Sequence, residues 1–214
     1  MTPGASQNFP NSKAPAFRSR LVLASASPRR RDILDKAGYI FECEDPGEVE
    51  NAIVAAPTPE ALAIAKARAK AMEVAARIRP PLPALVVGVD TLVALGDEVI
   101  GKPLDRLDAV SILSRLSRAR HRVISGVCLL WIGELGTLAA PLLDSASTWV
   151  TMRAMSLAEI EAYVATGQSD GKAGAYAIQE SGDQFVKELD GSLLNVVGMP
   201  LELFERLLPT LTLP

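Results

Sequence analysis

The sequence predicts an α/β fold built on a mixed, twisted sheet with helices on its faces. From about residue 20 onward, apolar runs of strand length alternate with amphipathic helical segments. The continuous apolar run Leu85–Val89 is typical of a strand that is buried on both faces. Turn signals at residues 96–97 and 190–191 predict hairpins, which add antiparallel pairs to the parallel crossovers. We therefore expect a sheet with strands of both directions.

Composition places the chain among globular proteins. It has 214 residues, of which 49% are hydrophobic and 22% charged, enough for one core or two closely joined lobes. Residues 1–17 are rich in Pro, Ser, Asn and Gly and lack the features of a signal or transit peptide, so we expect a disordered extension. Residues 18–214 are expected to form a single domain. No apolar run reaches membrane-spanning length.

Charge and cysteine content narrow the partners. The formal net charge is −3, so no global basic field is available to hold a nucleic acid. Cys43 and Cys128 lie in unrelated apolar contexts and fit buried thiols in a reducing cytoplasm. His121 is the only histidine, which excludes a zinc site of the His/Cys type. A catalytic metal would need carboxylate ligands, as the hard ions Mg²⁺ and Mn²⁺ prefer.

The first strand and helix carry the most informative pattern. Leu21–Leu23 reads as a strand, followed by a helix with Ser27 as N-cap, Pro28 at its first position and Gly38 at its end. Three arginines, at positions 29–31, fall in the first turn of that helix. Because the helix dipole and free N–H groups there favour an anion, this placement indicates a phosphorylated ligand. The alternative is a solvated basic turn with arginine stems lying on apolar surface.

Caps and turn residues define the remaining elements. A Thr58 cap predicts a helix to about Ile78, where Pro80 and Pro81 stop it, and the capping box at Ser156 predicts another that ends near Gly167. The other expected elements are strands at 85–89, 92–95, 98–100, 123–132 and 147–152, a helix from Asp105, a hairpin pair at 185–189 and 193–197, and a last helix at 200–208.

Several polar residues are candidates for chemistry on this scaffold. Asp90 follows the buried strand, where α/β folds place ligands and catalytic groups, although it could instead form the turn of a hairpin that begins at Thr91. Glu50 is either a second metal carboxylate or a loop charge. Lys102 precedes a proline in an extended loop and is either a phosphate partner or a surface lysine. Lys66 and Lys70 form one helix face, which by itself predicts solvation.

The segment 171–179 has the composition of a ligand-contacting loop. Two glycines and four alanines surround Lys172, Tyr176 and Gln179, so the backbone can approach a ligand closely. The Gln179 amide offers both a donor and an acceptor to the edge of a base. The chain has no Walker, dinucleotide-fingerprint, kinase or Ser-His-Asp pattern, which removes several phosphate-handling families.

Together these residues resemble the Maf nucleotide pyrophosphatases. The matching blocks occur in order at 25–30, 62–67, 88–91, 101–103, 121–126, 172–179 and 195–200. The resemblance implies an elongated, ITPase-like α/β fold with a deep cleft, commonly a homodimer. It also implies hydrolysis of nucleoside triphosphates to monophosphate and pyrophosphate with a divalent cation. Under it, residues 18–214 are one catalytic domain.

The resemblance also assigns roles. It places Asp90 on the family's proton acceptor, with Lys66 and Lys102 as further catalytic cations and Glu50 joining Asp90 at the metal. The residues it places at the substrate, with Arg29, Thr91 and Gln179 tied to base choice, are Ser25, Arg29, Arg30, Thr91, Lys172 and Gln179. Water attack at the α-phosphorus requires such cations, a carboxylate and an in-line leaving group.

This chain departs from the family pattern at Val89, Ser125, Val49 and Glu180. Val49 leaves the metal site short of one carboxylate, and Glu180 adds a charge beside the base-reading loop. The intact 172–179 block resembles the branch that acts on dTTP and UTP, and not the branch linked to 7-methyl-GTP. Two alternatives stay open: a house-cleaning enzyme for a modified nucleotide, and a nucleotide-responsive regulatory protein in cell-division control. We expect a cytoplasmic protein without nucleic-acid or membrane partners.

Overall fold

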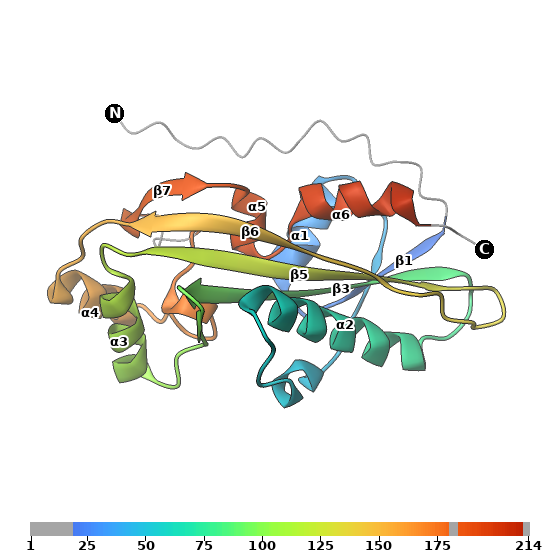
Figure 1. The fold of residues 1–214 in the computed structure, drawn as a ribbon, viewed down its shortest axis with the longest axis horizontal. Helices are drawn as coiled ribbons and strands as arrows, with labels where there is room; N and C mark the ends of the chain where they lie inside the picture. The colour runs from blue at the N-terminus through green and yellow to red at the C-terminus, as the bar shows by residue number, and fades with distance from the viewer. Residues whose placement is uncertain (1–18, 180–183, 212–214) are drawn as a thin grey trace.

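The structure, a computed structural model, describes residues 19–179 and 184–211 (Figure 1). The predicted N-terminal extension, residues 1–17, and Glu180 lie outside the described residues. The strands are β1 (Arg20–Ala24), β2 (Glu42–Glu44), β3 (Ala84–Leu95), β4 (Glu98–Ile100), β5 (Arg120–Ile132), β6 (Leu142–Met152) and β7 (Val186–Asp190). The helices are α1 (Pro28–Lys36), α2 (Pro59–Arg77), α3 (Arg106–Leu116), α4 (Leu157–Ala165), α5 (Leu193–Val197) and α6 (Leu201–Leu207), with short 3₁₀ turns η1 (Val49–Ala52), η2 (Ala173–Ala175) and η4 (Leu208–Thr210).

The predicted mixed sheet is confirmed. Within the described residues, seven strands form one sheet in the order β2-β1-β3-β5-β6-β7, with β4 beside β3. β1 is parallel to β2 and β3, and every other pair is antiparallel. Long antiparallel pairing of β3, β5 and β6 gives the molecule its elongated shape (Figure 1).

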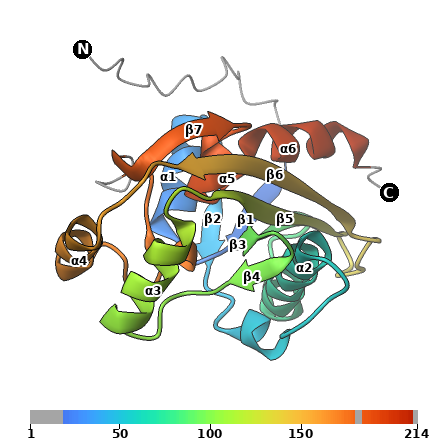
Figure 2. The same ribbon diagram turned by 60° about the vertical axis from the view of Figure 1, so that its left-hand side comes forward.

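Helices cover both faces of this sheet. α2 packs on one face, where its alanines meet side chains of β1, β3 and β5. On the other face, α1, α5 and α6 cover one end (Figures 1 and 2), and the side chains of α3, α4 and η2 pack against the other end. Side-chain alternation shows that these two groups share a face, because Val89 belongs to the first cluster and Val93 to the second. The boundary between the two clusters therefore falls near Thr91.

Most expected elements form with the expected caps. Thr58 and Asp105 accept hydrogen bonds from the backbone N–H groups of their helices, and Ser156 forms the predicted capping box with Glu159. Gly96, with φ of +62°, makes the turn between β3 and β4. Of the two cysteines, Cys128 is buried, whereas Cys43 is half-buried on β2.

Two expectations about element type or extent are wrong. The strand expected to end at Asp90 continues to Leu95, because β5 pairs with β3 along its length. Asp90 and Thr91 are therefore neither at a strand end nor in a hairpin turn. Residues 193–197, expected as a strand, form α5. Ser192 caps this helix, and the buried Asn195 side chain donates to the Val123 carbonyl and to Thr148 Oγ1.

Candidate active site

The candidate site lies at a break in the pairing of β3. On one edge of β3, pairing with β1 stops at Ala24 and Gly88, and pairing with β4 begins at Val93 and Ile100. Asp90 and Thr91 fall in the interval between these partners. The chain leaves β1 here and enters α1, so the N-terminus of α1 faces the same break. Successive side chains of a strand point to opposite faces of the sheet, so the side chains of Asp90 and Thr91 lie in two different environments.

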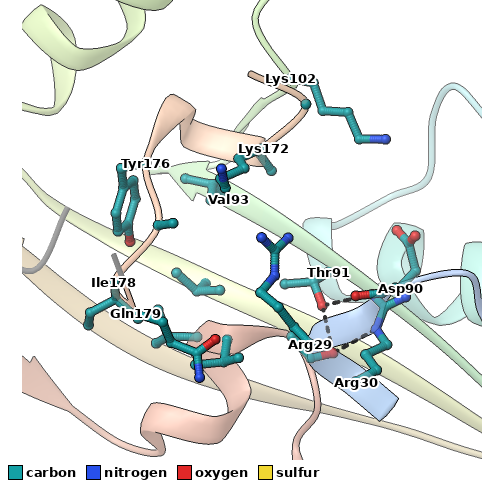
Figure 3. Close-up of a pocket in the computed structure, with 18 of the residues that line it drawn as sticks. Arg29, Arg30, Asp90, Thr91, Val93, Lys102, Lys172, Tyr176, Ile178 and Gln179 are labelled. Carbon is teal, nitrogen blue, oxygen red and sulfur yellow. Dashed lines mark hydrogen bonds between the residues drawn. The ribbon is translucent and has the colours of Figure 1, made fainter. Parts of the chain in front are cut away.

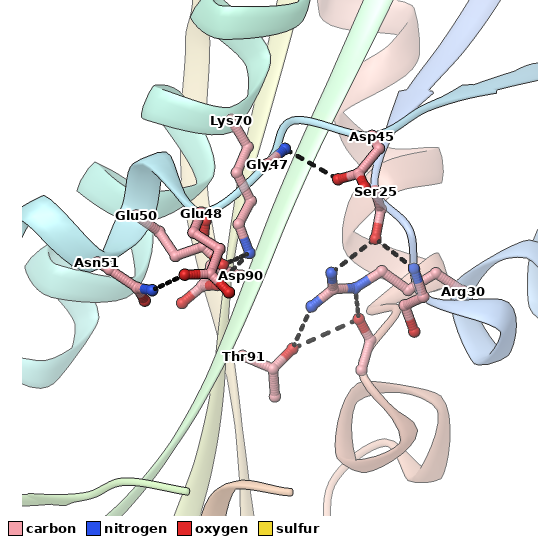
Figure 4. A network of polar contacts seen from close by, with 12 residues as sticks. Ser25, Arg30, Asp45, Gly47, Glu48, Glu50, Asn51, Lys70, Asp90 and Thr91 are labelled. Atoms are coloured by element: carbon pink, nitrogen blue, oxygen red, sulfur yellow. Dashed lines mark hydrogen bonds and ion pairs between the residues drawn. The ribbon is translucent and has the colours of Figure 1, made fainter. Parts of the chain in front are cut away.

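Thr91 belongs to a network of neutral groups around Arg30. The Arg30 guanidinium donates to Ser25 Oγ at 2.9 Å, to the Gly198 carbonyl at 2.8 Å and to Thr91 Oγ1 at 3.3 Å (Figure 4). Thr91 Oγ1 is also 2.9 Å from Ser125 Oγ. Burial lowers the pKa of Arg30, and the nearby Asp90 opposes that shift. The three acceptors are uncharged, so they orient the guanidinium without neutralising it.

Asp90 belongs to a second, ionic cluster. Lys70 Nζ lies 2.7 Å from Asp90 Oδ1 and 2.9 Å from Glu50 Oε1 (Figure 4). The three side chains are at most 16% exposed. Burial alone would raise the pKa of Glu50, but the hydrogen bond from Lys70, aided by the charges of Lys70 and Lys102, holds that pKa below its usual value. Glu50 is therefore ionised at neutral pH.

Close packing of α2 on the sheet brings Lys70 to Asp90. A Cβ on Gly88 would lie 2.1 Å from the Ala67 carbonyl oxygen, and a Cβ on Gly126 would lie 2.3 Å from the Ala63 backbone. Gly88 is two residues before Asp90, and Gly126 is the cross-strand partner of Asp90. Only glycine permits this approach of helix to sheet.

A cavity of about 330 Å³ opens at this break (Figure 3). It is lined at one end by the start of α1 and at the other by the loop before β7, and it includes both Asp90 and Thr91. Four cationic side chains contribute to its wall: Arg29, Arg30, Lys102 and Lys172. The α1 N-terminus has no acidic residue in its first turn and no side-chain cap bond from Ser27. The cavity therefore offers an anion several cations and free helix N–H groups.

The loop 171–179 forms the opposite wall of the cavity. Gly174 and Ala175 both have positive φ, +74° and +58°, and the second value is strained for a residue with a side chain. Buried Tyr163 accepts the Ala177 N–H at its hydroxyl oxygen, which ties the loop to α4. Gln179 lines the cavity at the end of this loop. The backbone is thus held in an unusual shape beside the space where a ligand fits.

The structure brings most of the sequence-predicted residues together. Arg29, Arg30, Asp90, Thr91, Lys102, Lys172 and Gln179 line the cavity. Ser25 and Glu50 stand one contact behind it, through Arg30 and Lys70. Lys66 lies one turn before Lys70 on α2 and is not among the residues that line the cavity. Its catalytic role stays a prediction.

Lys70 is the residue that sequence reasoning missed. The helix face of Lys66 and Lys70 was expected to be solvated, yet Lys70 is only 6% exposed. The available signal is the spacing of Ala63, Ala67 and Ala71, which marks the helix stripe that contacts the sheet. Because helical side chains lean toward the N-terminus, Lys70 beside this stripe reaches back to Asp90.

Glu50 and Asp90 are the carboxylates that could hold a metal ion at this site. Among the described residues, no group of three or more His, Cys, Asp or Glu side chains could hold a metal ion. Glu50 and Asp90 nonetheless fit a magnesium-type ion, which binds through one or two carboxylates and takes its other ligands from water and phosphate. The buried Glu50 Oε2 atom has no hydrogen-bond partner among the described residues, so it is free to coordinate a cation.

The fold and the cavity define an α/β protein with a cation-lined cleft beside a carboxylate pair. The chain belongs to the Maf-like protein family, which matches residues 20–211. It is 41% identical over 182 residues to a dTTP/UTP pyrophosphatase of Anaeromyxobacter dehalogenans, covering 85% of this chain and 89% of the relative. It is 40% identical to a dTTP/UTP pyrophosphatase of Sphingopyxis alaskensis, covering 91% and 97%. The predicted family resemblance is confirmed.

Solved structures show more distant likeness. A HAM1 protein from Coxiella burnetii has a TM-score of 0.41 and 16% identity, covering 90% of this chain and 100% of that one. The family of this chain is shown by its sequence relatives. Among the described residues, no helix is both long and apolar enough to cross a membrane.

Proposed function

We propose that this chain is a nucleoside triphosphate pyrophosphatase that converts dTTP and UTP to the monophosphate and pyrophosphate. The observation that carries the proposal is the cavity at the break in β3, which Asp90 and four cationic residues line together. The named relatives at about 40% identity act on these two nucleotides, and the 172–179 loop that resembles their branch lines the cavity.

The proposed reaction is hydrolysis at the α-phosphorus. Water forms a new P–O bond, the bond to the bridging α–β oxygen breaks, and pyrophosphate leaves with that oxygen. Asp90 accepts the proton of the attacking water. Arg29, Arg30 and Lys102 bind the phosphate oxygens and offset the charge that moves to pyrophosphate. Lys172 and Lys66 are proposed as further cationic partners.

Glu50 and Asp90 are the proposed ligands of a magnesium or manganese ion. When bound, such an ion polarises the phosphate and the attacking water.

Ser25 and Thr91 act through Arg30, since both accept hydrogen bonds from its guanidinium. Gln179 is proposed to pair with the carbonyl and N–H edge of thymine or uracil, and the tight 173–177 backbone excludes a larger base.

Pyrophosphate release tests this function directly. We expect turnover of dTTP and UTP that exceeds turnover of CTP, GTP and modified nucleotides, with loss in EDTA and recovery on addition of Mg²⁺ or Mn²⁺. A preference for GTP or for a modified nucleotide would contradict the substrate assignment. Full activity in the chelator would contradict the role of the metal.

The proposal extends to the state of the enzyme in the cell. On the resemblance, we propose a cytoplasmic homodimer without nucleic-acid partners. Light scattering during gel filtration, at several protein concentrations, distinguishes a stable dimer from a monomer. A monomer that turns over dTTP at the full rate would contradict the dimer without affecting the assigned activity.

A further inference from the structure

We infer that Lys70 is a positioning residue of this site: its ammonium holds Glu50 and Asp90 side by side and weakens the attraction of this carboxylate pair for a divalent cation. The effect on turnover rests on the proposed function. The effect on cation binding does not, because it is measurable on the protein without substrate.

The geometry places one cation between two acids. Lys70 Nζ bonds one oxygen of each, at 2.7 Å to Asp90 and 2.9 Å to Glu50, in an environment where all three side chains are nearly buried. Two carboxylates this close repel each other. Lys70 offsets one of the two negative charges and fixes the orientation of both groups. The cluster keeps a net charge of −1.

The bonding of Lys70 leaves room for a second cation. It uses Glu50 Oε1 and Asp90 Oδ1, whereas the buried Glu50 Oε2 has no hydrogen-bond partner among the described residues. A carboxylate oxygen only accepts, so an unpaired buried one is costly unless a positive group completes it. The ammonium and an added ion therefore share the same two acids, and they repel each other.

Structural stability alone does not account for Lys70. Ala67 and Ala71 of the same helix already pack against Gly88, so apolar contact holds α2 on the sheet. Buried ion pairs of this kind contribute little net stability compared with apolar side chains of similar size. A lysine buried between two acids at a candidate active site is better explained by what it does to those acids.

Direct titration with Mn²⁺ alone tests the inference. Free Mn²⁺ is measured by electron paramagnetic resonance on the full chain without nucleotide. In Lys70→Met and Lys70→Gln, which remove the charge at similar length, we expect Mn²⁺ to bind about tenfold more tightly because the competing cation is gone. Lys70→Arg keeps the charge and should bind Mn²⁺ as the parent does. Arg68→Met removes an exposed charge from the same helix and serves as the matched control.

Kinetics then separate positioning from substrate binding. With dTTP, both charge-removing variants should lose about tenfold or more in kcat, with KM changed less than about threefold, because the disturbed group is the carboxylate pair and not the phosphate partners. Circular dichroism checks that each variant is folded. If Lys70→Met does not fold, Lys70→Gln, which retains a hydrogen-bond donor, is used in its place.

Mn²⁺ affinity that is unchanged or weaker in folded charge-removing variants would overturn the inference. So would tighter Mn²⁺ binding with parental kcat, because the orientation of the acids would then not depend on Lys70. If the parent itself hydrolyses no nucleoside triphosphate, the proposed function fails, and the Mn²⁺ titration still decides the effect of Lys70 on cation binding.

Discussion

Arg30 and Lys70 are two cations on either side of the same strand, and they differ in the charge of the groups that they contact. Arg30 is surrounded by uncharged acceptors, namely two hydroxyl oxygens and one carbonyl. Lys70 is surrounded by two carboxylates. The first arrangement keeps a positive charge available for a phosphate. The second leaves one negative charge available for a metal ion.

The comparison shows how adjacent residues of one strand create opposite binding preferences. Thr91 contributes a hydroxyl to the group around Arg30, which with Ser25 and Gly198 forms the Arg30 side of the site. Asp90 contributes a carboxylate to the group of Lys70, Glu50 and Asp90, which forms the Lys70 side. Neither preference depends on the net charge of the chain, which is only −3. A reaction that needs both an anionic substrate and a cationic cofactor can therefore be served at one break in the sheet.

The largest expected effect comes from Asp90→Asn, which breaks the Lys70 side. Asparagine has nearly the same shape but neither charge nor basicity. We expect kcat for dTTP to fall at least about a hundredfold, the usual scale for loss of a general base. Binding of pyrophosphate, measured by calorimetry, should change little because the Arg30 side is intact. Asp97→Asn, an exposed change in the adjacent turn, is the control. Activity of the Asp90 variant within a few-fold of the parent would refute its role as proton acceptor.

Arg30→Met breaks the other side and has the next largest effect. Hydrogen bonds to a charged group contribute about 1.5–3 kcal/mol, so we expect kcat/KM to fall about ten- to two-hundredfold. Pyrophosphate binding should weaken, while Mn²⁺ binding to the free protein should stay at the parental level. Arg31→Met removes the neighbouring, exposed charge and should leave all three quantities unchanged. Loss of Mn²⁺ binding in the Arg30 variant would show that the two sides are not separate.

A smaller effect is expected at Gln179, which belongs to neither charged group. Loss of a buried hydrogen-bonding group costs roughly 1–3 kcal/mol of discrimination, or about ten- to two-hundredfold in relative specificity. In Gln179→Ala, kcat/KM should fall for dTTP and UTP relative to CTP and GTP, with phosphate binding intact. Gln184→Ala, at an exposed position that does not line the cavity, is the matched control. Equal loss for all four nucleotides would show that Gln179 does not read the base.

Local sequence signals predict most of the elements and the cationic wall of the cavity. Caps, proline positions and turn glycines are local, so the helices after Ser27 and Thr58 and the turn at Gly96 appear where expected. Two of the three cations in the first turn of α1, Arg29 and Arg30, likewise line the cavity because a helix N-terminus fixes their position, whereas Arg31 is exposed outside it. These features depend on residues close together in the chain.

The Lys70 side depends on contacts between distant residues. Asp90 is 20 positions from Lys70 and 40 from Glu50, and close packing at Gly88 and Gly126 is what joins them. The extent of β3 also depends on a distant partner, since β5 extends the strand beyond the polar pair that suggested an end. Residues 193–197 illustrate the same limit, because a short apolar run fits a strand or a helix until its tertiary contacts decide.

The smallest predicted effect concerns His121, which lies apart from both charged groups. It is fully buried, with Nε2 2.9 Å from the Tyr176 hydroxyl, and its Nδ1 has no hydrogen-bond partner among the described residues. Burial lowers the pKa of His121 from 6.5 to about 4. The folded state therefore binds fewer protons than the unfolded state between these values. The stability that neutral His121 contributes is complete above about pH 6.5 and is lost as the pH falls toward 4.

Urea unfolding at pH 7.5 and pH 5.0 checks this prediction. One pKa unit corresponds to about 1.4 kcal/mol, so the free energy of unfolding of the parent should fall about 2 kcal/mol more than that of His121→Gln, which does not titrate. Glu159 does not contribute in this window, because hydrogen bonds from Ser156 hold its pKa at about 2 and its effect is lost only below its ordinary value of 4.5. Glu50, held ionised by Lys70, likewise titrates at lower pH. An equal fall in parent and variant would show that His121 does not cause the acid sensitivity between pH 7.5 and pH 5.0, and the prediction would then be wrong.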